Sequence, residues 1–465
     1  MNKTDFSGYA GYLFVLLALC TFPLTAAETY KFRLYLKDKA GNGYSAAEPE
    51  KYLSPAAIER RAVQGIPVTE SDQPLTPAYL DTLAACGTHI VTRSKWLNTV
   101  VVDTPDSTLA GKLNELAFVD SVRWVWKGCD TLARPEQPDV SRLLNTDRPE
   151  DDPYGYASSQ IRLHNGEKLH EAGFRGEGMR VAVIDAGFAF ADRMNAFDST
   201  RIAGTYNFVS PGQTVYAWDD HGTKVLSCLA AGLPGIFIGT APEATYWLLK
   251  SEDSRTEFPV EEDYWVAAAE YADSVGVSVI TSSLGYFTFD NPRLEYGKGA
   301  LDGRTSLISR GASIAASKGM LLFCSAGNEG SGEWEKITFP GDAPSVVTVG
   351  AVNQNRKRSS FSSKGFTADW RIKPDVVALG SGCCVLGSDG NIQYANGTSF
   401  ATPVLAGLAV CLWQALPGLS NREMVSLLQE AGHQYTHPDV ELGYGIPDLY
   451  QAYLLHREPD YRPTL

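Results

Sequence analysis

Four polar residues in this sequence have the types that carbonyl chemistry requires. In chain order they are Asp185, His221, Asn328 and Ser399. A serine hydroxyl attacks a carbonyl only when a base within hydrogen-bond reach takes its proton, and a histidine can be that base. A carboxylate can orient the histidine, and an amide can donate a hydrogen bond to a developing oxyanion. These residue types indicate nucleophilic hydrolysis if folding brings them together.

The local sequence around each residue favours a site at the ends of secondary-structure elements. Asp185 and Asn328 each follow an apolar, strand-like run. In an open α/β sheet, groups at the carboxyl ends of the strands form the ligand site. His221 precedes an apolar helical stretch, and Ser399 lies where a loop turns into a helix, whose dipole favours a reactive polar group. All four positions are therefore compatible with one shared site.

Each residue taken alone also fits an ordinary structural role. Asp185 suits the cap of a loop, and Ser399 suits the N-cap of a helix. His221 is typical of a structural or exposed histidine, and Asn328 of a turn beside glycine. The functional hypothesis therefore depends on the combination and order of the four residues.

The segments that contain these residues resemble the subtilases, the subtilisin-like serine peptidases. The run 397–403, Gly-Thr-Ser-Phe-Ala-Thr-Pro, matches the family's serine motif completely, and His221-Gly222-Thr223 and Gly327-Asn328 match two further motifs. The order Asp, His, Ser matches as well. Weaker matches extend the resemblance over roughly residues 155–455; they are Ser283-Leu284-Gly285, Phe361-Ser362-Ser363, 373–378 and Gly443-Tyr444-Gly445.

The resemblance implies a role for each of the four residues. His221 would take the proton of Ser399 during attack and return it to the leaving amine, while Asp185 holds the imidazole tautomer. Asn328 and the backbone N–H of Ser399 would donate to the oxyanion. Activity should fall as His221 becomes protonated, near its ordinary pKa of about 6.5.

Three positions depart from the family pattern without removing a catalytic group. Ala186 stands where Ser or Thr usually follows the aspartate, Lys224 where His is frequent, and Leu379 where Pro is common. These departures bear on the rate and the pH profile of the expected enzyme.

The resemblance also implies that a polypeptide substrate binds in an extended form. A peptide would add as a strand beside Ser283, Leu284 and Gly285, with Ser325, Ala326 and Gly327 as the opposite wall of the primary pocket. Small uncharged residues in these walls suggest room for a sizeable, hydrophobic side chain. Ordinary loops at the end of a sheet are the alternative interpretation of both segments.

The elements that must position these residues alternate from about residue 154 onward. Apolar strand-like runs alternate with helical stretches, and the runs are 179–184, 245–249, 277–280, 321–324 and 346–349. This pattern predicts an α/β domain over residues 154–456, with a doubly wound, mostly parallel sheet and helices on both faces. The resemblance makes that sheet subtilisin-like.

A smaller domain precedes it. Residues 28–126 show the order β-α-β-β-α-β of a ferredoxin-like α+β module, with one helix beginning at Ser54. Subtilases commonly carry such a propeptide, which assists folding and inhibits the site. The runs 54–61 and 94–98 resemble pro-regions of bacterial envelope members. A permanent accessory domain is the alternative.

Residues 127–153, rich in proline and acids, predict an exposed linker that contains the processing site.

The N-terminus indicates export. Lys3 precedes an apolar run over residues 9–24, followed by small residues, which is typical of a signal peptide spanning 1–27 and cleaved after Ala27. An uncleaved anchor is the alternative. We expect a periplasmic, cell-surface or extracellular protein without a further membrane span, and residues 457–465 form a polar tail.

Composition excludes several classes of protein. The 465 residues include 40 Lys and Arg but 54 Asp and Glu, a net charge of −14 that argues against nucleic acid as a partner. Seven cysteines outside the signal are too few and too scattered for a disulfide scaffold, and Cys383-Cys384 are expected to be free thiols. No motif predicts a zinc site. We expect a monomer that needs no cofactor for its chemistry, and no acidic loop has the spacing of a calcium site.

The sequence therefore predicts a secreted serine endopeptidase that acts through an acyl-enzyme and is made as a self-inhibited precursor. Its partners would be polypeptide substrates and its own propeptide. A catalytically silent peptide-binding or scaffold protein of the cell envelope is the main alternative, although a pure binder needs none of the four groups. An acid-active relative with a carboxylic base and an esterase or amidase are two others.

Overall fold

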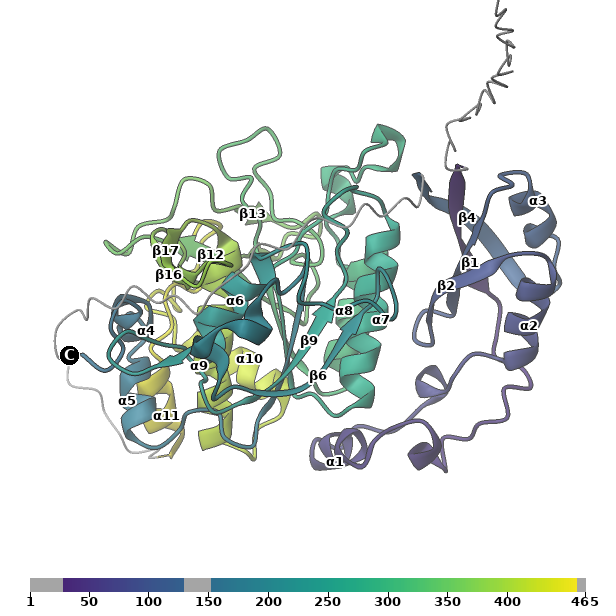
Figure 1. Ribbon diagram of the computed structural model, residues 1–465. Coiled ribbons are helices and arrows are strands. Elements are labelled where there is room, and N and C mark those ends of the chain that lie inside the picture. Colours follow the sequence, from purple (N-terminus) through teal and green to yellow (C-terminus); the bar gives the residue numbers. More distant parts are fainter. Residues whose placement is uncertain (1–27, 129–151, 458–465) are drawn as a thin grey trace, which may run out of the picture.

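The computed structural model describes residues 28–128 and 152–457 (Figure 1). The expected signal peptide, most of the linker and nearly all of the C-terminal tail lie outside the described residues. A small N-terminal domain lies beside a larger domain that contains the rest of the chain.

The larger domain is built on a seven-stranded sheet in the order β15-β12-β11-β10-β5-β9-β6. All neighbouring strands run parallel. The strands are β5 (Arg180–Asp185), β6 (Arg201–Asn207), β9 (Thr245–Lys250), β10 (Val279–Ser282), β11 (Leu321–Ser325), β12 (Val347–Val352) and β15 (Val376–Leu379). The predicted doubly wound parallel sheet is confirmed. The chain starts in the middle at β5 and extends the sheet first on one side and then on the other.

Two strands were not expected from the sequence. β6 lies at the edge of the sheet and exposes alternate residues, so its sequence RIAGTYN lacks a continuous apolar run. β15 is fully buried but has only four residues. Short apolar runs and half-exposed edges carry a weak periodic signal, which explains why both were missed.

Helices cover both faces of the sheet, as predicted. On one face, α6 (His221–Ala230) packs against α9 (Thr398–Ala415), while α7 (Val260–Ser274) and α8 (Leu307–Ser317) pack together on the other. The remaining helices of this domain are α4 (Ser158–Arg162), α5 (Gly166–Glu171), α10 (Asn421–Glu430) and α11 (Leu449–Arg457).

The central helix α9 belongs to the core. Among the described residues it alone is long and apolar enough to cross a membrane, but 89% of it is buried inside the domain. It packs on strands β10, β11, β12 and β15, so its apolar sequence is explained by burial on all sides.

Three short antiparallel hairpins complete the larger domain. They are β7 (Gly232–Leu233) with β8 (Phe237–Ile238), β13 (Gly365–Phe366) with β14 (Ile372–Lys373), and β16 (Cys383–Leu386) with β17 (Ile392–Ala395). Cys383 and Cys384 are both free and buried, and burial raises the pKa of Cys384 well above its ordinary value. These thiols therefore behave as small apolar side chains.

The small domain has a four-stranded antiparallel sheet in the order β2-β3-β1-β4. Its strands are β1 (Thr29–Leu36), β2 (His89–Ser94), β3 (Thr99–Thr104) and β4 (Val119–Gly128), and its sheet-connecting helices are α2 (Pro77–Ala85) and α3 (Leu109–Asn114). This arrangement is the predicted ferredoxin-like topology.

Helix α1 (Pro55–Val63) begins at the predicted N-cap, Ser54, but lies away from the small sheet (Figure 1). The sequence interpretation had used it as the first helix of the ferredoxin-like module, and that was wrong: α2 fills this place. Arg60 and Arg61 of α1 instead bind the carboxylate of Asp273 on α7. Arg61 also pairs with Asp72 (3.0 Å), so α1 ties the small domain to the large one.

Two further buried contacts hold the small sheet against α7. The Arg33 guanidinium binds both carboxylate oxygens of Asp263, with Nε and Nη2 at 2.8 and 2.6 Å from Oδ1 and Oδ2. Glu270 accepts hydrogen bonds from Ser94 Oγ (2.5 Å) and from the backbone N–H groups of Lys95 and Trp96 (both 3.0 Å). The two runs singled out in the sequence, 54–61 and 94–98, are therefore docking segments.

Candidate active site

Asp185 and His221 form a direct pair at the carboxyl end of the sheet. Asp185 is the last residue of β5 and is fully buried, and His221 is the first residue of α6. Asp185 Oδ1 lies 2.7 Å from His221 Nδ1 and also accepts the N–H of Ala186 at 2.8 Å. Because Nδ1 is occupied by the carboxylate, Nε2 is the nitrogen left to act as a base.

The surroundings of His221 favour its protonated form. Burial by itself lowers the pKa of His221, but the negative charges of Asp185, Asp219 and Glu252 outweigh burial and raise the pKa to about 9. Asp219 also accepts the backbone N–H of His221 at 2.8 Å. The value near 6.5 expected from the sequence is therefore corrected upward, because the sequence does not show which carboxylates surround the ring.

Ser399 lies at the start of the buried helix α9, as its motif predicts, and is 8% exposed. Its Oγ donates to the carbonyl of Ser283 at 3.4 Å, while Ser283 Oγ donates to the carbonyl of Ser399 at 2.7 Å. The hydroxyl is thus not yet hydrogen-bonded to His221. Ser399 and His221 line the same cavity, and such bonds are often loose until a substrate closes the site.

Asn328 is held with its amide in one orientation. Its Oδ1 accepts the backbone N–H of Thr398 at 2.9 Å and the Thr398 hydroxyl at 3.1 Å. Since the oxygen is used in this way, Nδ2 is the atom available to donate. Asn328 follows β11 and lines the cavity beside Ser399, where an oxyanion would need a donor.

These residues surround a cleft of about 340 Å³. Of the two expected walls, Ser283, Leu284, Gly285, Ser325 and Gly327 line the cleft. Ala326 does not line it; this residue is fully buried and contributes its backbone carbonyl to the support behind the wall. Ser325 Oγ donates to the Leu284 carbonyl at 3.4 Å, so the two walls are directly linked.

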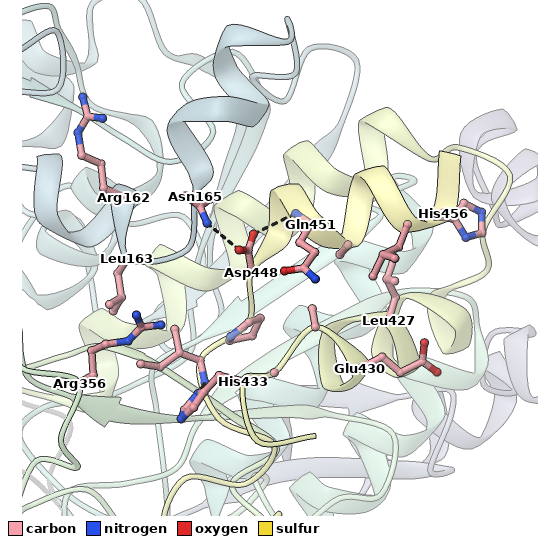
Figure 2. Close-up of a pocket in the computed structure, with 16 residues that line it drawn as sticks. Arg162, Leu163, Asn165, Arg356, Leu427, Glu430, His433, Asp448, Gln451 and His456 are labelled. Atoms are coloured by element: carbon pink, nitrogen blue, oxygen red, sulfur yellow. Dashed lines mark hydrogen bonds between the residues drawn. The ribbon is translucent and has the colours of Figure 1, made fainter. Parts of the chain in front are cut away.

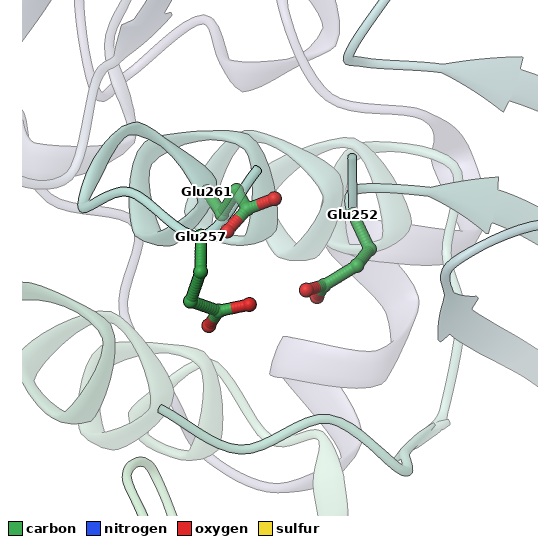
Figure 3. Close-up of side chains that lie close together, drawn as sticks. All are labelled: Glu252, Glu257 and Glu261. Atoms are coloured by element: carbon green, nitrogen blue, oxygen red, sulfur yellow. The ribbon is translucent and has the colours of Figure 1, made fainter. Parts of the chain in front are cut away.

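The cleft also has acidic residues, and of these the sequence alone pointed only to Asp219, which lies two positions before His221. Glu252 and Glu257 line it, together with Glu329 and Asp219. Figure 3 shows Glu252 and Glu257 with Glu261; ligand oxygens of the three lie within 4.8 Å of one another. Their loop spacing matches no standard acidic motif, so only the tertiary structure brings them together.

Burial and mutual repulsion keep protons on this carboxylate cluster of Glu252, Glu257 and Glu261. Burial and the charge of Asp185 raise the pKa of Glu252 to about 7, although Tyr286 donates to it at 2.7 Å. Burial and the charge of Glu252 raise the pKa of Glu257 to about 8, and burial raises that of Glu261 well above its ordinary value. The negative charge of the cleft therefore grows as the pH rises through neutrality.

The pH dependence of activity should report these charges. A base must be unprotonated, so activity should appear only as the pH rises past the pKa of His221, and the acid limb of kcat/KM should lie above 6.5, towards 9. Between pH 7 and 9 the Glu252 carboxylate is largely ionised. Glu252→Gln therefore removes a negative charge near His221 and should shift the acid limb of kcat/KM to lower pH. A pH–rate profile measures both effects.

Glu329→Gln is the matched control, because Glu329 lines the same cleft but is not among the principal charges acting on His221. An acid limb that stays in place in Glu252→Gln, or moves equally in both variants, would contradict this account of the ring's environment.

A second, larger cavity of about 560 Å³ lies between α10, α11 and the segment 162–165 (Figure 2). Asp448 accepts the side-chain amide of Asn165 at 2.7 Å and the backbone N–H of Gln451 at 2.9 Å along one side of it. It shares no lining residue with the cleft around Ser399.

Comparisons with known proteins agree with the geometry. A model of the subtilase family matches residues 176–445, and a model of the peptidase S8 propeptide domain of Bacteroidota matches residues 31–140. The second match covers the small domain, which agrees with its interpretation as a propeptide.

Two subtilisins and one solved structure are similar to this chain. Subtilisin E of Bacillus subtilis (strain 168) is 32% identical over 281 residues, which are 60% of this chain and 65% of that protein. Subtilisin of Bacillus pumilus is 32% identical over 304 residues, 64% of this chain and 98% of that protein. The solved structure of MycP1 with its N-terminal propeptide removed has a TM-score of 0.51 at 22% identity, covering 64% of this chain and 96% of that one. This last likeness concerns the fold alone.

Proposed function

The chain belongs to the subtilase family, and on that premise we propose that it is an exported serine endopeptidase, made as a precursor that its own N-terminal domain inhibits. The observation that carries the proposal is that His221, Asn328 and Ser399 line one cleft while the buried Asp185 is hydrogen-bonded to His221. Four residues spread over more than two hundred positions of sequence converge there.

The proposed reaction follows from the geometry of these groups. On substrate binding, Ser399 Oγ leaves the Ser283 carbonyl, gives its proton to His221 Nε2 and attacks the peptide carbonyl. Asp185 stabilises the imidazolium through Nδ1. The oxyanion accepts hydrogen bonds from Asn328 Nδ2 and the backbone N–H of Ser399.

The tetrahedral intermediate then breaks down to an acyl-enzyme, and hydrolysis of the acyl-enzyme completes the cycle. His221 protonates the leaving amine, the C–N bond breaks, and an acyl-enzyme remains on Ser399. Water then attacks the ester with His221 as base, which releases the acid and restores the hydroxyl. Only protein groups and water take part in these steps.

Labelling with a fluorophosphonate and a digest of casein test the proposal. We expect the label on Ser399 of the processed protein and cleavage of casein faster than of short esters. Absence of label would favour the alternative, a silent peptide-binding or scaffold protein. Label with ester hydrolysis but no casein cleavage would favour an esterase.

An inhibitory domain must stay bound to the catalytic domain, and buried ion pairs hold the small domain there. Arg33 is 4% exposed and its partner Asp263 is 4% exposed, so either charge left alone would be buried without compensation. Breaking such a pair by removing one partner costs about 3–5 kcal/mol. We therefore expect Arg33→Ala to loosen the docked domain by a free energy of that order.

Hydrogen exchange of residues 28–128 in a full-length Ser399→Ala background measures this loosening. Arg123→Ala is the matched control, because Arg123 is an exposed arginine of the same domain. Equal protection in the two variants would argue against a docking role for the Arg33–Asp263 pair.

A further inference from the structure

One side chain closes the bottom of the cleft and takes no part in the proposed chemistry. Thr338 lines the same cavity as Ser399. Its backbone N–H donates to the carbonyl of Ala326 at 3.1 Å, and the next residue, Phe339, exchanges two 3.0 Å backbone hydrogen bonds with Tyr286. The backbone at Thr338 is therefore tied to both walls of the cleft, 283–286 and 325–327.

The Thr338 side chain fills the space between these walls. A methyl group added to Gly285 would lie 2.2 Å from Thr338 Oγ1, and one added to Gly327 would lie 2.8 Å from Thr338 Cγ2. Both distances are shorter than real Cβ contacts, so Thr338 touches the backbone on either side. The sequence alone suggested room for a sizeable side chain between small residues, and Thr338 lies between two of them, Gly285 and Gly327.

The hydroxyl of Thr338 lacks a partner. Thr338 is 3% exposed, and its Oγ1 has no hydrogen bond with any described residue. A buried hydroxyl without a partner is unfavourable, because it has lost its water without replacement. Since Thr338 lines a cleft shared with the nucleophile, a polar substrate group that reaches this hydroxyl would supply the missing hydrogen bond.

We propose that Thr338 restricts the cleft to a small side chain in the residue immediately before the scissile bond, and that its hydroxyl favours a polar one. The inference rests on the proposed function and names its substrate class: polypeptides with serine or alanine at that position, serine being preferred. A phenylalanine ring there would overlap the Thr338 methyl and hydroxyl groups. The backbone hydrogen bonds on both sides hold the Thr338 backbone in place.

Peptides that differ only in the residue before the scissile bond test the inference. For the processed wild-type protein, we expect kcat/KM for phenylalanine to be at least about 100-fold below that for alanine. We expect serine to exceed alanine by about 2- to 10-fold, the size of one hydrogen bond.

Three variants separate the size of Thr338 from its hydroxyl. Thr338→Gly should raise the phenylalanine-to-alanine ratio by about 10-fold or more, with Thr338→Ala giving a smaller change in the same direction. Thr338→Val keeps the volume, so it should still reject phenylalanine but lose the preference for serine over alanine. Thr436→Val, at an exposed position outside the cleft, is the matched control and should keep both ratios.

Several results would overturn the inference. Wild-type cleavage after phenylalanine as fast as after alanine would do so, as would an unchanged ratio in both Thr338→Gly and Thr338→Ala. A serine preference that survives in Thr338→Val would remove the role of the hydroxyl. Fluorophosphonate titration of Ser399 counts the folded active sites in each sample. A wild-type protein that takes no label and cuts no peptide would contradict the proposed function itself.

Discussion

Ser399→Ala is expected to lower kcat for peptide hydrolysis by about 10⁴- to 10⁶-fold, because it removes the only atom proposed to form the acyl bond. The residual rate would come from the oxyanion donors and substrate binding, which the change leaves in place. Fluorophosphonate labelling should disappear, and the purified precursor should remain uncut when it is made in a protease-free system. Casein hydrolysis and intact mass measure these outcomes.

The design separates loss of chemistry from loss of folding. Ser317→Ala is the matched control, because Ser317 is exposed on α8 and its Oγ only donates to the Ile314 carbonyl of the same helix. Wild-type enzyme added in trans should cut the Ser399→Ala precursor if it is folded. Normal trimming of the variant without added enzyme would count against self-processing, and full casein hydrolysis would refute Ser399 as the nucleophile.

Asp185→Asn is expected to lower kcat by about 10⁴-fold while preserving the fold. The Asp185 carboxylate accepts from His221 Nδ1 through Oδ1, and its Oδ2 has no hydrogen-bond partner among the described residues. An amide can place its NH₂ toward the ring and hold the wrong tautomer. It also removes the principal negative charge that raises the pKa of His221.

Two readouts distinguish this role from a structural one. The rate of fluorophosphonate labelling should fall along with kcat, and the remaining activity should have an acid limb at lower pH than the wild type. Asp198→Asn, at an exposed position of the same domain, is the matched control. A variant with an unchanged acid limb, or one that loses its thermal unfolding transition, would not support Asp185 as the residue that orients His221.

The candidate catalytic residues could be picked out from the sequence because most of them belong to short contiguous motifs. The segment 397–403 combines a helix start, small residues and the nucleophile in one run, and His221 and Asn328 have similar short contexts. Apolar runs of strand length predicted the central strands that carry Asp185 and Asn328. Motifs and buried strands can be recognised in the sequence when the residues that form them are neighbours in the chain.

The charges around His221 were not predictable in the same way. Glu252 follows β9, whereas His221 begins α6, and nothing in the spacing of Glu252 marks a site. The pKa of a histidine depends on charges within a few ångströms, whichever part of the chain supplies them. The expected value near 6.5 leaves out the charge of Glu252, which only the folded arrangement brings to the ring.

The sequence by itself determined the family motifs, the parallel sheet and the candidate catalytic residues, because these depend on residue type and short-range order. The tertiary structure decided that Thr338 lies between Gly285 and Gly327, that α1 docks on α7, and that acids gather beside His221. Threonine, arginine and glutamate are common residues, and their role in a protein depends on which groups pack against them. Contacts between distant segments arise from topology, which brings loops at the ends of neighbouring parallel strands to one edge of the sheet.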